Sequence, residues 1–308
     1  MNALVAARKN AGLSSDPNAA FLISEDAHSS FKKFSKIMGL KENNLIKVKT
    51  NEDGCMDLLN LKKVIASCSV ENKKIFSIVA TLGTTIRGAI DPIKDIVEIC
   101  KENNIWLHID GSIGGIFSIT NIPLDGSNSI KHANSITINP QKIIGITKTS
   151  SLLLVSNIDT LKNSFHTGIP YISSYSGFID RGELGIQGSR PAEVIKLWLG
   201  LRYLGINGIK DILKSSIERK EFIKSNLEIS KFDIYSGPLH IISFLPKGLS
   251  INETNLWSER IKNELMLNNF MLSRPKYKGK YLLRAVMGNY NTNKSHILKL
   301  LRLINSKL

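Results

Sequence analysis

Cysteine is scarce in this sequence of 308 residues, which contains Cys55, Cys68 and Cys100. Their number is odd and none is spaced as C-x-x-C, which argues against a disulfide framework and against a zinc site. We therefore expect three reduced, mostly buried thiols and no bound metal.

Long hydrophobic runs are absent as well. No apolar stretch reaches the roughly 18 residues that a membrane-spanning helix needs. The start of the sequence also lacks the apolar segment of about 7 to 15 residues that is typical of a signal peptide. We therefore expect a cytoplasmic protein without a membrane partner.

Acidic side chains are few compared with basic ones. The sequence holds 26 Asp and Glu against 41 Lys and Arg, which gives a formal net charge of +15. Such an excess could attract nucleic acid, because clustered cations gain affinity by releasing counterions from phosphates. The lysines are scattered, however, and they outnumber the arginines. We interpret the charge as a solvated surface and expect no nucleic-acid partner.

The first half of the chain alternates short β-rich runs with helical patterns. The β-rich runs lie at 21–23, 45–48, 75–80, 105–109 and 135–139, and the helical patterns at 1–10, 30–38, 57–68 and 93–100. This alternation is typical of an α/β fold with a largely parallel, doubly wound sheet. In such sheets ligands bind beyond the carboxyl ends of the strands.

The second half is less regular. We predict a long, mostly irregular loop at 157–188. A helical pattern then extends to about Leu227, with a break near Gly205. Short strands and helices follow and predict a smaller α+β domain, so we expect a large domain at 1–224 and a C-terminal domain at 225–308.

Lys142, Asp110 and His28 each follow a predicted strand. Taken alone, each has an ordinary interpretation: a solvated lysine, an aspartate bonded to nearby amides and a capping histidine. Together with Asn139 they match the needs of pyridoxal phosphate, an aldehyde cofactor. That cofactor requires an amine for a Schiff base, an acid at its ring nitrogen, a flat group over the ring and donors around its phosphate.

Two motifs carry a family resemblance, HIDGSIGG at 108–115 and NPQK at 139–142. They resemble the patterns H-V-D-A-A-Y-G-G and N/D-P-H-K of the pyridoxal-phosphate-dependent group II amino acid decarboxylases. That family includes the aromatic amino acid, glutamate and 2,4-diaminobutyrate decarboxylases. The resemblance extends from Met1 to about Leu300 and includes Q-x-S-R at 187–190 and the segment 281–292.

The resemblance implies the PLP-dependent transferase-like fold, fold type I, with a mostly parallel sheet in the large domain and a smaller C-terminal α+β domain. It implies decarboxylation of an L-amino acid to the corresponding amine, through a Schiff base on Lys142, in a homodimer. In the family a Gly/Ser-rich phosphate-binding loop precedes the helix that matches residues 1–10, so we expect an N-terminally truncated derivative. The alternative is a non-catalytic truncated relic or a partner subunit of such a decarboxylase.

The resemblance also implies roles for single residues around the cofactor. Lys142 would carry it, Asp110 would pair with its ring nitrogen and His28 would stack on its ring. Asn139 would donate to the phosphate, and the Thr81 hydroxyl would point to the cofactor.

Two positions near the cofactor depart from the family. Gly111 and Ser112 replace the usual alanines and add a hydroxyl near the ring. Gln141 replaces the histidine before the lysine, and a glutamine can donate a hydrogen bond but cannot titrate near neutral pH. We count Ser112 and Gln141 among the residues that bind the cofactor.

Other predicted roles concern the substrate and the assembly. Tyr171, or else Tyr175, would return a proton after decarboxylation from a mobile loop. Arg284 would receive a substrate carboxylate, with a structural ion pair as an equal alternative. Arg190 would make a domain or dimer contact, or a plain surface ion pair.

Overall fold

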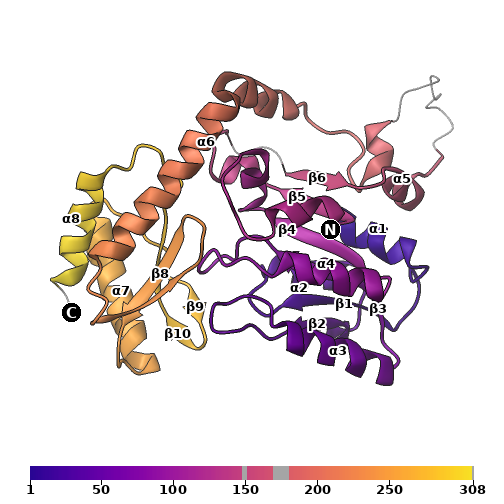
Figure 1. Ribbon diagram of the computed structural model, residues 1–308, viewed down its shortest axis with the longest axis horizontal. Coiled ribbons are helices and arrows are strands. Elements are labelled where there is room, and N and C mark those ends of the chain that lie inside the picture. The colour runs from indigo at the N-terminus through magenta and orange to yellow at the C-terminus, as the bar shows by residue number, and fades with distance from the viewer. Residues whose placement is uncertain (148–150, 169–179, 307–308) are drawn as a thin grey trace.

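A computed structural model describes residues 1–147, 151–168 and 180–306. Its larger sheet has six strands in the order β2-β1-β3-β4-β5-β6 (Figure 1). They are β1 (Ala19–Ser24), β2 (Leu45–Val48), β3 (Lys74–Thr81), β4 (Trp106–Gly111), β5 (Ser135–Ile138) and β6 (Leu152–Val155). The first five are parallel and β6 is antiparallel to β5, so the mostly parallel sheet expected from the sequence is confirmed.

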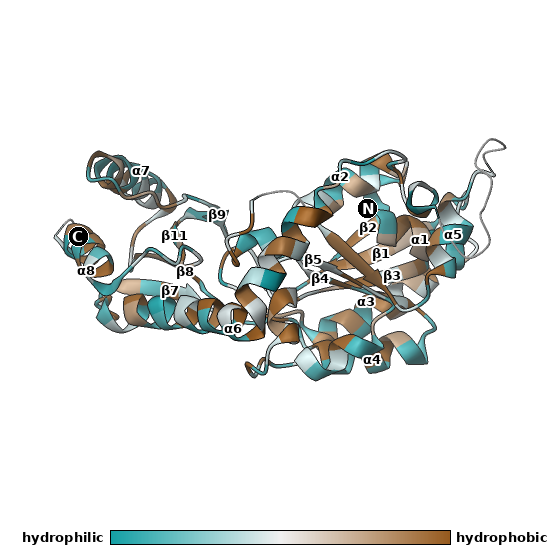
Figure 2. Cartoon of the chain, turned by 90° about the horizontal axis from the view of Figure 1, so that it is seen from above, coloured by the Kyte–Doolittle hydropathy of each residue, from teal (hydrophilic) through white to brown (hydrophobic). Residues whose placement is uncertain are grey.

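Helices cover both faces of this sheet (Figure 2). They are α1 (Asn2–Asn10), α2 (Ser30–Ile37), α3 (Leu58–Val70) and α4 (Ile93–Glu102). Along β1, Phe21 and Ile23 pack with α1 and α2, whereas Leu22 packs with α3 and α4. Successive side chains thus enter opposite layers, which explains why the strands are hydrophobic runs without alternation.

The prediction of a mostly irregular loop at 157–188 was wrong in one respect. The helix α5 (Asp159–Phe165) lies within it, and a 3-10 turn follows at Arg181–Leu184. Leu161 and Leu184 are buried against Ala6 of α1. A helix of seven residues has little propensity of its own, and packing against α1 stabilises it.

The long helix α6 (Val194–Asn226) connects the larger sheet to the rest of the chain (Figure 1). Gly205 interrupts it with φ 59° and ψ 179°, at the break that the sequence predicts. The C-terminal lobe, residues 227–306, contains the sheet β11-β8-β7, the hairpin β9-β10 and two helices. Its elements are β7 (Phe232–Ser236), β8 (Ile241–Pro246), α7 (Ile251–Leu267), β9 (Lys276–Tyr277), β10 (Lys280–Tyr281), β11 (Leu283–Val286) and α8 (Lys294–Asn305).

The C-terminal lobe has its own hydrophobic core and contacts the loop that follows β3. Arg284 donates to the Thr85 carbonyl at 2.6 Å, and Ser243 donates to the carbonyl of the next residue in that loop. Tyr277 donates its hydroxyl to Asp26 at 2.8 Å, near the end of β1. These contacts hold two loops at the carboxyl edge of the larger sheet.

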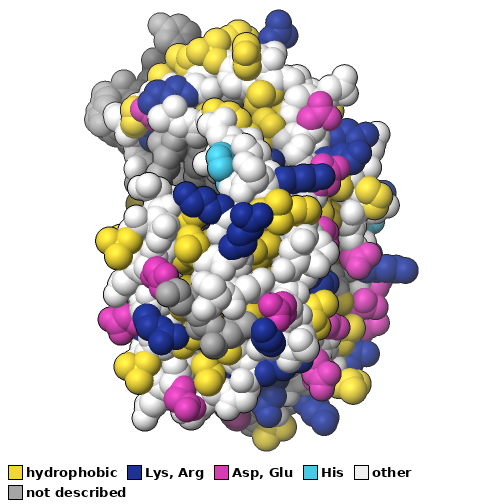
Figure 3. Space-filling view, turned by 90° about the vertical axis from the view of Figure 1, so that its left-hand side faces the viewer, with side chains coloured by type: hydrophobic (Ala, Val, Ile, Leu, Met, Phe, Trp, Pro, Cys, Tyr) yellow, Lys and Arg dark blue, Asp and Glu magenta, His cyan; other side chains and the backbone are white. Residues whose placement is uncertain are grey.

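The surface of the C-terminal lobe carries mixed charge. Figure 3 views the molecule from this side and shows basic side chains interspersed with acidic and hydrophobic ones. Among the described residues, no helix is both long and apolar enough to cross a membrane.

Candidate active site

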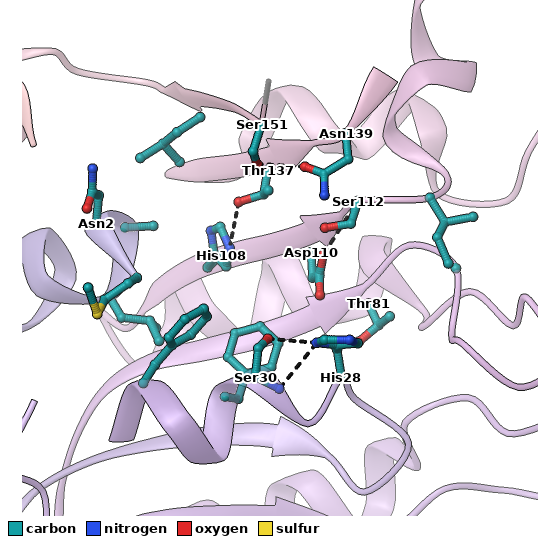
Figure 4. Close-up of a pocket in the computed structure, with 18 of the residues that line it drawn as sticks. Asn2, His28, Ser30, Thr81, His108, Asp110, Ser112, Thr137, Asn139 and Ser151 are labelled. Atoms are coloured by element: carbon teal, nitrogen blue, oxygen red, sulfur yellow. Dashed lines mark hydrogen bonds between the residues drawn. The ribbon is translucent and has the colours of Figure 1, made fainter. Parts of the chain in front are cut away.

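A cavity of about 360 Å³ lies at the carboxyl ends of β1, β3, β4 and β5. Six residues singled out from the sequence line it: His28, Thr81, Asp110, Ser112, Asn139 and Lys142. Figure 4 shows five of them, all but Lys142, converging from separate elements. The strand order explains this, because parallel neighbours end at the same edge of the sheet.

Asp110 lies at the centre of this edge. In the register of the sheet its neighbours are Thr81 on β3 and Thr137 on β5. The backbone N–H of Ser112 donates to Asp110 Oδ1 at 3.1 Å. A Cβ at Gly111 would lie 2.9 Å from the Thr137 carbonyl oxygen, so glycine allows the close approach of the two strands here. The carboxylate is thus fixed between two hydroxyl-bearing side chains.

Lys142 ends a short 3-10 turn, Pro140–Lys142, that directly follows β5. Its backbone N–H donates to the Asn139 carbonyl at 3.1 Å. The residue as a whole is exposed, yet burial around its amine lowers the Lys142 pKa, and the negative charge of Asp110 raises it in part. A lowered pKa increases the fraction of neutral, nucleophilic amine near neutral pH.

His28 lies at the cavity mouth, in the turn between β1 and α2. Its Nδ1 lies 2.8 Å from the Ser30 hydroxyl and accepts from the Ser30 backbone N–H at 3.2 Å. These two contacts fix the plane of an otherwise exposed ring. The ring can therefore offer a flat surface to a ligand in the cavity.

Two hydrogen bonds hold the polar wall of the cavity. Asn139 Oδ1 accepts from the Ser151 hydroxyl at 2.6 Å. Thr81, at the end of β3, donates its backbone N–H to Asp91 Oδ2 at 2.7 Å, while its hydroxyl is buried without a partner among the described residues. Thr81 is thus held by its backbone, and its side chain keeps its hydrogen-bonding capacity.

The sequence-based selection missed His108 and Thr137, which also line the cavity. His108 precedes Asp110 by two residues on β4, and Thr137 on β5 precedes Asn139, just beyond that strand, by two. Side chains two apart in a strand share a face. The same periodicity could therefore have identified both residues.

The remaining selected residues lie elsewhere or outside the described residues. Gln141 and Arg284 are not among the described residues that line the cavity. Gln141 Oε1 is buried without a described partner, and Arg284 donates to Ser273 and to the Thr85 carbonyl. Tyr171 and Tyr175 lie outside the described residues. Their roles, and that of Arg284 toward a substrate, stay predictions.

Arg190 is an exposed residue, and its guanidinium donates to the Arg181 carbonyl. The domain or dimer contact suggested for it stays a prediction. Among the described residues no cluster of three or more His, Cys, Asp or Glu side chains could hold a metal ion.

Residues 5–242 match the pyridoxal-dependent decarboxylase conserved domain. The chain belongs to this decarboxylase family. The aromatic-L-amino-acid decarboxylase of Bacillus atrophaeus is 27% identical, over 98% of this chain and 65% of that protein. The acidic amino acid decarboxylase GADL1 of Xenopus tropicalis is 32% identical, over 73% of this chain and 45% of that protein. This family member thus spans at most 65% of the length of these two relatives.

Solved structures show the same fold. The structure of Oryza sativa TDC with PLP and tryptamine matches with a TM-score of 0.92 at 18% identity, over 99% of this chain and 67% of that one. Mouse CSAD matches with a TM-score of 0.89 at 21% identity, over 99% of this chain and 69% of that one. The decarboxylase domain therefore has the fold of the PLP-dependent fold type I enzymes, as expected from the sequence.

Proposed function

We propose that this protein binds pyridoxal 5'-phosphate and decarboxylates an L-amino acid to the corresponding amine. The observation that carries the proposal is that Lys142 and Asp110 line one cavity at the carboxyl edge of a parallel sheet. Family membership and the named decarboxylase relatives support the same reaction.

The chemistry of the donor set fits the cofactor. Lys142 supplies an amine of lowered pKa, Asp110 a carboxylate, and Thr81 a hydroxyl with unused hydrogen-bonding capacity. When bound, pyridoxal phosphate supplies an aldehyde that an amine can attack and a protonated ring that accepts the electron pair released with carbon dioxide. The cavity, about 360 Å³, lies within the range of small-molecule sites.

Each residue has a defined role in this proposal. Lys142 would attach the cofactor covalently through its ε-amine. Asp110 would accept the hydrogen of the protonated ring nitrogen and stabilise its positive charge. His28 would cover one face of the ring, and Asn139 would donate to the phosphate.

Further roles depend on residues with fewer supporting contacts. Ser112, which lines the cavity, and Gln141, which does not, would be further cofactor-binding residues. Tyr171 would provide the proton that replaces the carboxylate on the substrate carbon. Relatives named for aromatic and for acidic amino acids support an amino acid substrate without selecting one.

Absorbance spectroscopy with added cofactor tests the proposal. Purified protein mixed with pyridoxal phosphate should develop a band near the edge of the visible range, and Lys142→Ala should abolish it. Lys131→Ala, which removes an exposed lysine outside the cavity lining, is the matched control and should keep the band. Carbon dioxide release from candidate amino acids then tests the reaction. If wild-type protein at saturating cofactor gives no band, the alternative, a non-catalytic relic or partner subunit, is supported.

We also propose that the protein is a homodimer located in the cytoplasm. Exposed apolar side chains on the first half of α6 support a dimer, among them Trp198 and Tyr203, which are 58% and 90% exposed. The free thiols of Cys55, Cys68 and Cys100 fit a reducing compartment. Subcellular fractionation tests the location.

A further inference from the structure

A chain of hydrogen bonds connects the core to the cavity beside Asp110. Trp106 Nε1 donates to Ser135 Oγ at 2.8 Å, and Ser135 Oγ lies 2.9 Å from His108 Nδ1. His108 Nε2 in turn lies 3.4 Å from Thr137 Oγ1, the longest link, drawn as a dashed line in Figure 4. Trp106, Ser135 and His108 are buried, whereas Thr137 is half-buried and lines the cavity.

The direction of the first link in this chain is fixed by its donor. An indole N–H can only donate, so Ser135 Oγ is the acceptor from Trp106. The Ser135 hydroxyl keeps a single hydrogen, which it can donate to His108 Nδ1, 2.9 Å away. A neutral imidazole that accepts at Nδ1 carries its hydrogen on Nε2. With the hydrogen on Nε2, His108 donates to Thr137 Oγ1, 3.4 Å away, and the Thr137 hydroxyl hydrogen is available to another acceptor.

His108 stays neutral for a separate reason. Burial lowers its pKa to about 4, more than the Asp110 carboxylate and the Ser135 carbonyl raise it. At neutral pH the ring therefore keeps one donor and one acceptor nitrogen. A protonated ring would donate from both nitrogens and would reverse the link to Ser135.

Asn139, which directly follows β5 two residues after Thr137, also has a fixed orientation. Its Oδ1 accepts from the Ser151 hydroxyl, so the two hydrogens of its amide nitrogen are directed away from that contact. Figure 4 shows this nitrogen turned from Ser151 toward the cavity. Thr137 and Asn139 thus form a neutral wall of hydrogen-bond donors, which suits an anionic oxygen.

We propose that Thr137 is a further ligand-binding residue, whose hydroxyl donates to an anionic phosphate oxygen of the bound cofactor beside Asn139, and that Trp106, Ser135 and His108 are positioning residues that fix the direction of this bond. The proposal rests on the proposed function, because the cofactor phosphate is the anion concerned. It adds two cavity residues, His108 and Thr137, to those selected from the sequence.

The test compares pyridoxal phosphate with pyridoxal, which has no phosphate. Thr137→Val keeps the shape of the side chain and removes the hydroxyl, so it should weaken pyridoxal phosphate binding about tenfold and leave pyridoxal binding unchanged. Thr137→Ser keeps the hydroxyl and should restore the affinity. Ser135→Ala should weaken only pyridoxal phosphate binding, and by less. An equal loss for both ligands, or no loss for either, would overturn the proposal.

Nitrogen-15 NMR of labelled histidine in the unliganded protein provides a second readout. We expect the His108 signals of a neutral ring with hydrogen on Nε2 at pH 7, and a mixture of tautomers in Ser135→Ala. A hydrogen on Nδ1 in the wild type would contradict the direction of the chain.

If the wild type binds neither pyridoxal compound, the proposed function fails. The contact of Thr137 with an anion is then tested with inorganic phosphate instead. Phosphate binding lost in Thr137→Val would then support the anion contact, and unchanged binding would refute it.

Discussion

At the residue scale, the carboxylate of Asp110 has the most demanding role in the proposed reaction. In that reaction it would pair with a ring nitrogen that must stay positively charged, and the Ser112 backbone N–H fixes its position. Asp110→Asn keeps the shape and removes the charge. We expect it to keep the absorbance band, because Lys142 is intact, and to lower the turnover number by about 100-fold or more. Asp125→Asn, outside this cavity, is the control. A turnover near that of the wild type would exclude the electrostatic role.

Arg284 is bonded to protein groups in the structure, although its sequence context suggests a substrate carboxylate. Its guanidinium donates to the Ser273 hydroxyl at 2.8 Å and to the Thr85 carbonyl at 2.6 Å. We expect Arg284→Gln to lower the free energy of unfolding by about 2 kcal/mol, measured by urea denaturation. Arg302→Gln, at an exposed site on α8, should change it by less than about 0.5 kcal/mol. A raised KM with unchanged stability would instead favour the carboxylate role.

The sequence indicates single site residues where a motif includes them and misses those that act through a neighbour. Asp110 and Lys142 were found because polar groups at strand ends are conspicuous. His108 was missed although it begins the motif HIDGSIGG, because it lies within a hydrophobic strand and its partner Ser135 is 27 residues away. Contacts between strands depend on register, which the sequence of one strand does not reveal.

At the scale of elements, the kink in α6 depends on one backbone conformation. Gly205 has φ 59° and ψ 179°, a region open essentially only to glycine. Apart from the adjacent helix backbone, no atom of the described residues lies within 4 Å of a Cβ built at this position, so backbone strain opposes a side chain here. We expect Gly205→Ala to lower the free energy of unfolding by about 1 to 3 kcal/mol. Gly208→Ala, in regular helix three residues later, should be neutral or stabilising in the same denaturation measurement. Equal effects would refute this explanation.

Asp91 connects two elements near the site. Its Oδ1 accepts from the Met56 backbone N–H before α3, and its Oδ2 from the Thr81 backbone N–H at the end of β3, both at 2.7 Å. Burial raises the pKa of Asp91 to about 7, well above its usual value, although both bonds lower it. The folded state therefore binds a proton more tightly than the unfolded state. The contribution of Asp91 to the free energy of unfolding is therefore fully present below about pH 4 and is lost as the pH rises through about 7.

Asp91→Asn removes this titration and leaves one backbone N–H without an acceptor. We expect its free energy of unfolding to be lower than that of the wild type. This difference, the margin, should shrink by roughly 2 kcal/mol between pH 5 and pH 7 and be constant above pH 8. Urea denaturation across this range measures the margin. Asp95→Asn, an exposed change of the same charge on α4, is the control for net charge. A margin that grows with pH would contradict the assignment.

Most elements of the larger sheet were predictable, because each is a buried run flanked by turn residues. The elements that were missed are short: α5 has seven residues, and β9 and β10 have two each. Such segments carry too few residues for a periodic signal, and tertiary contacts decide their structure. Contacts between residues far apart in the sequence could not be predicted either, such as the hydrogen bond between Tyr277 and Asp26, which are 251 residues apart.

At the scale of the whole molecule, the first half of α6 exposes several apolar side chains close together in the sequence. Val194, Ile195, Trp198, Leu199 and Tyr203 are all exposed there. The Arg202 guanidinium lies 5.8 Å from the centre of the Trp198 ring, so a cationic group borders the apolar side chains. Aromatic and arginine side chains of this kind are enriched in protein interfaces. The proposed homodimer would bury them.

Trp198→Glu tests this surface, because it places a charge among the apolar groups that the dimer would cover. We expect the wild type to sediment as a dimer at micromolar concentration, and Trp198→Glu to weaken the association by about 30-fold or more, as for truncation of a central aromatic contact. Analytical ultracentrifugation across a dilution series measures both. Leu267→Glu, at a leucine 85% exposed on α7, adds the same charge away from α6 and should leave the dimer intact. A dimer equally stable in both variants would mean that other surfaces hold the subunits together.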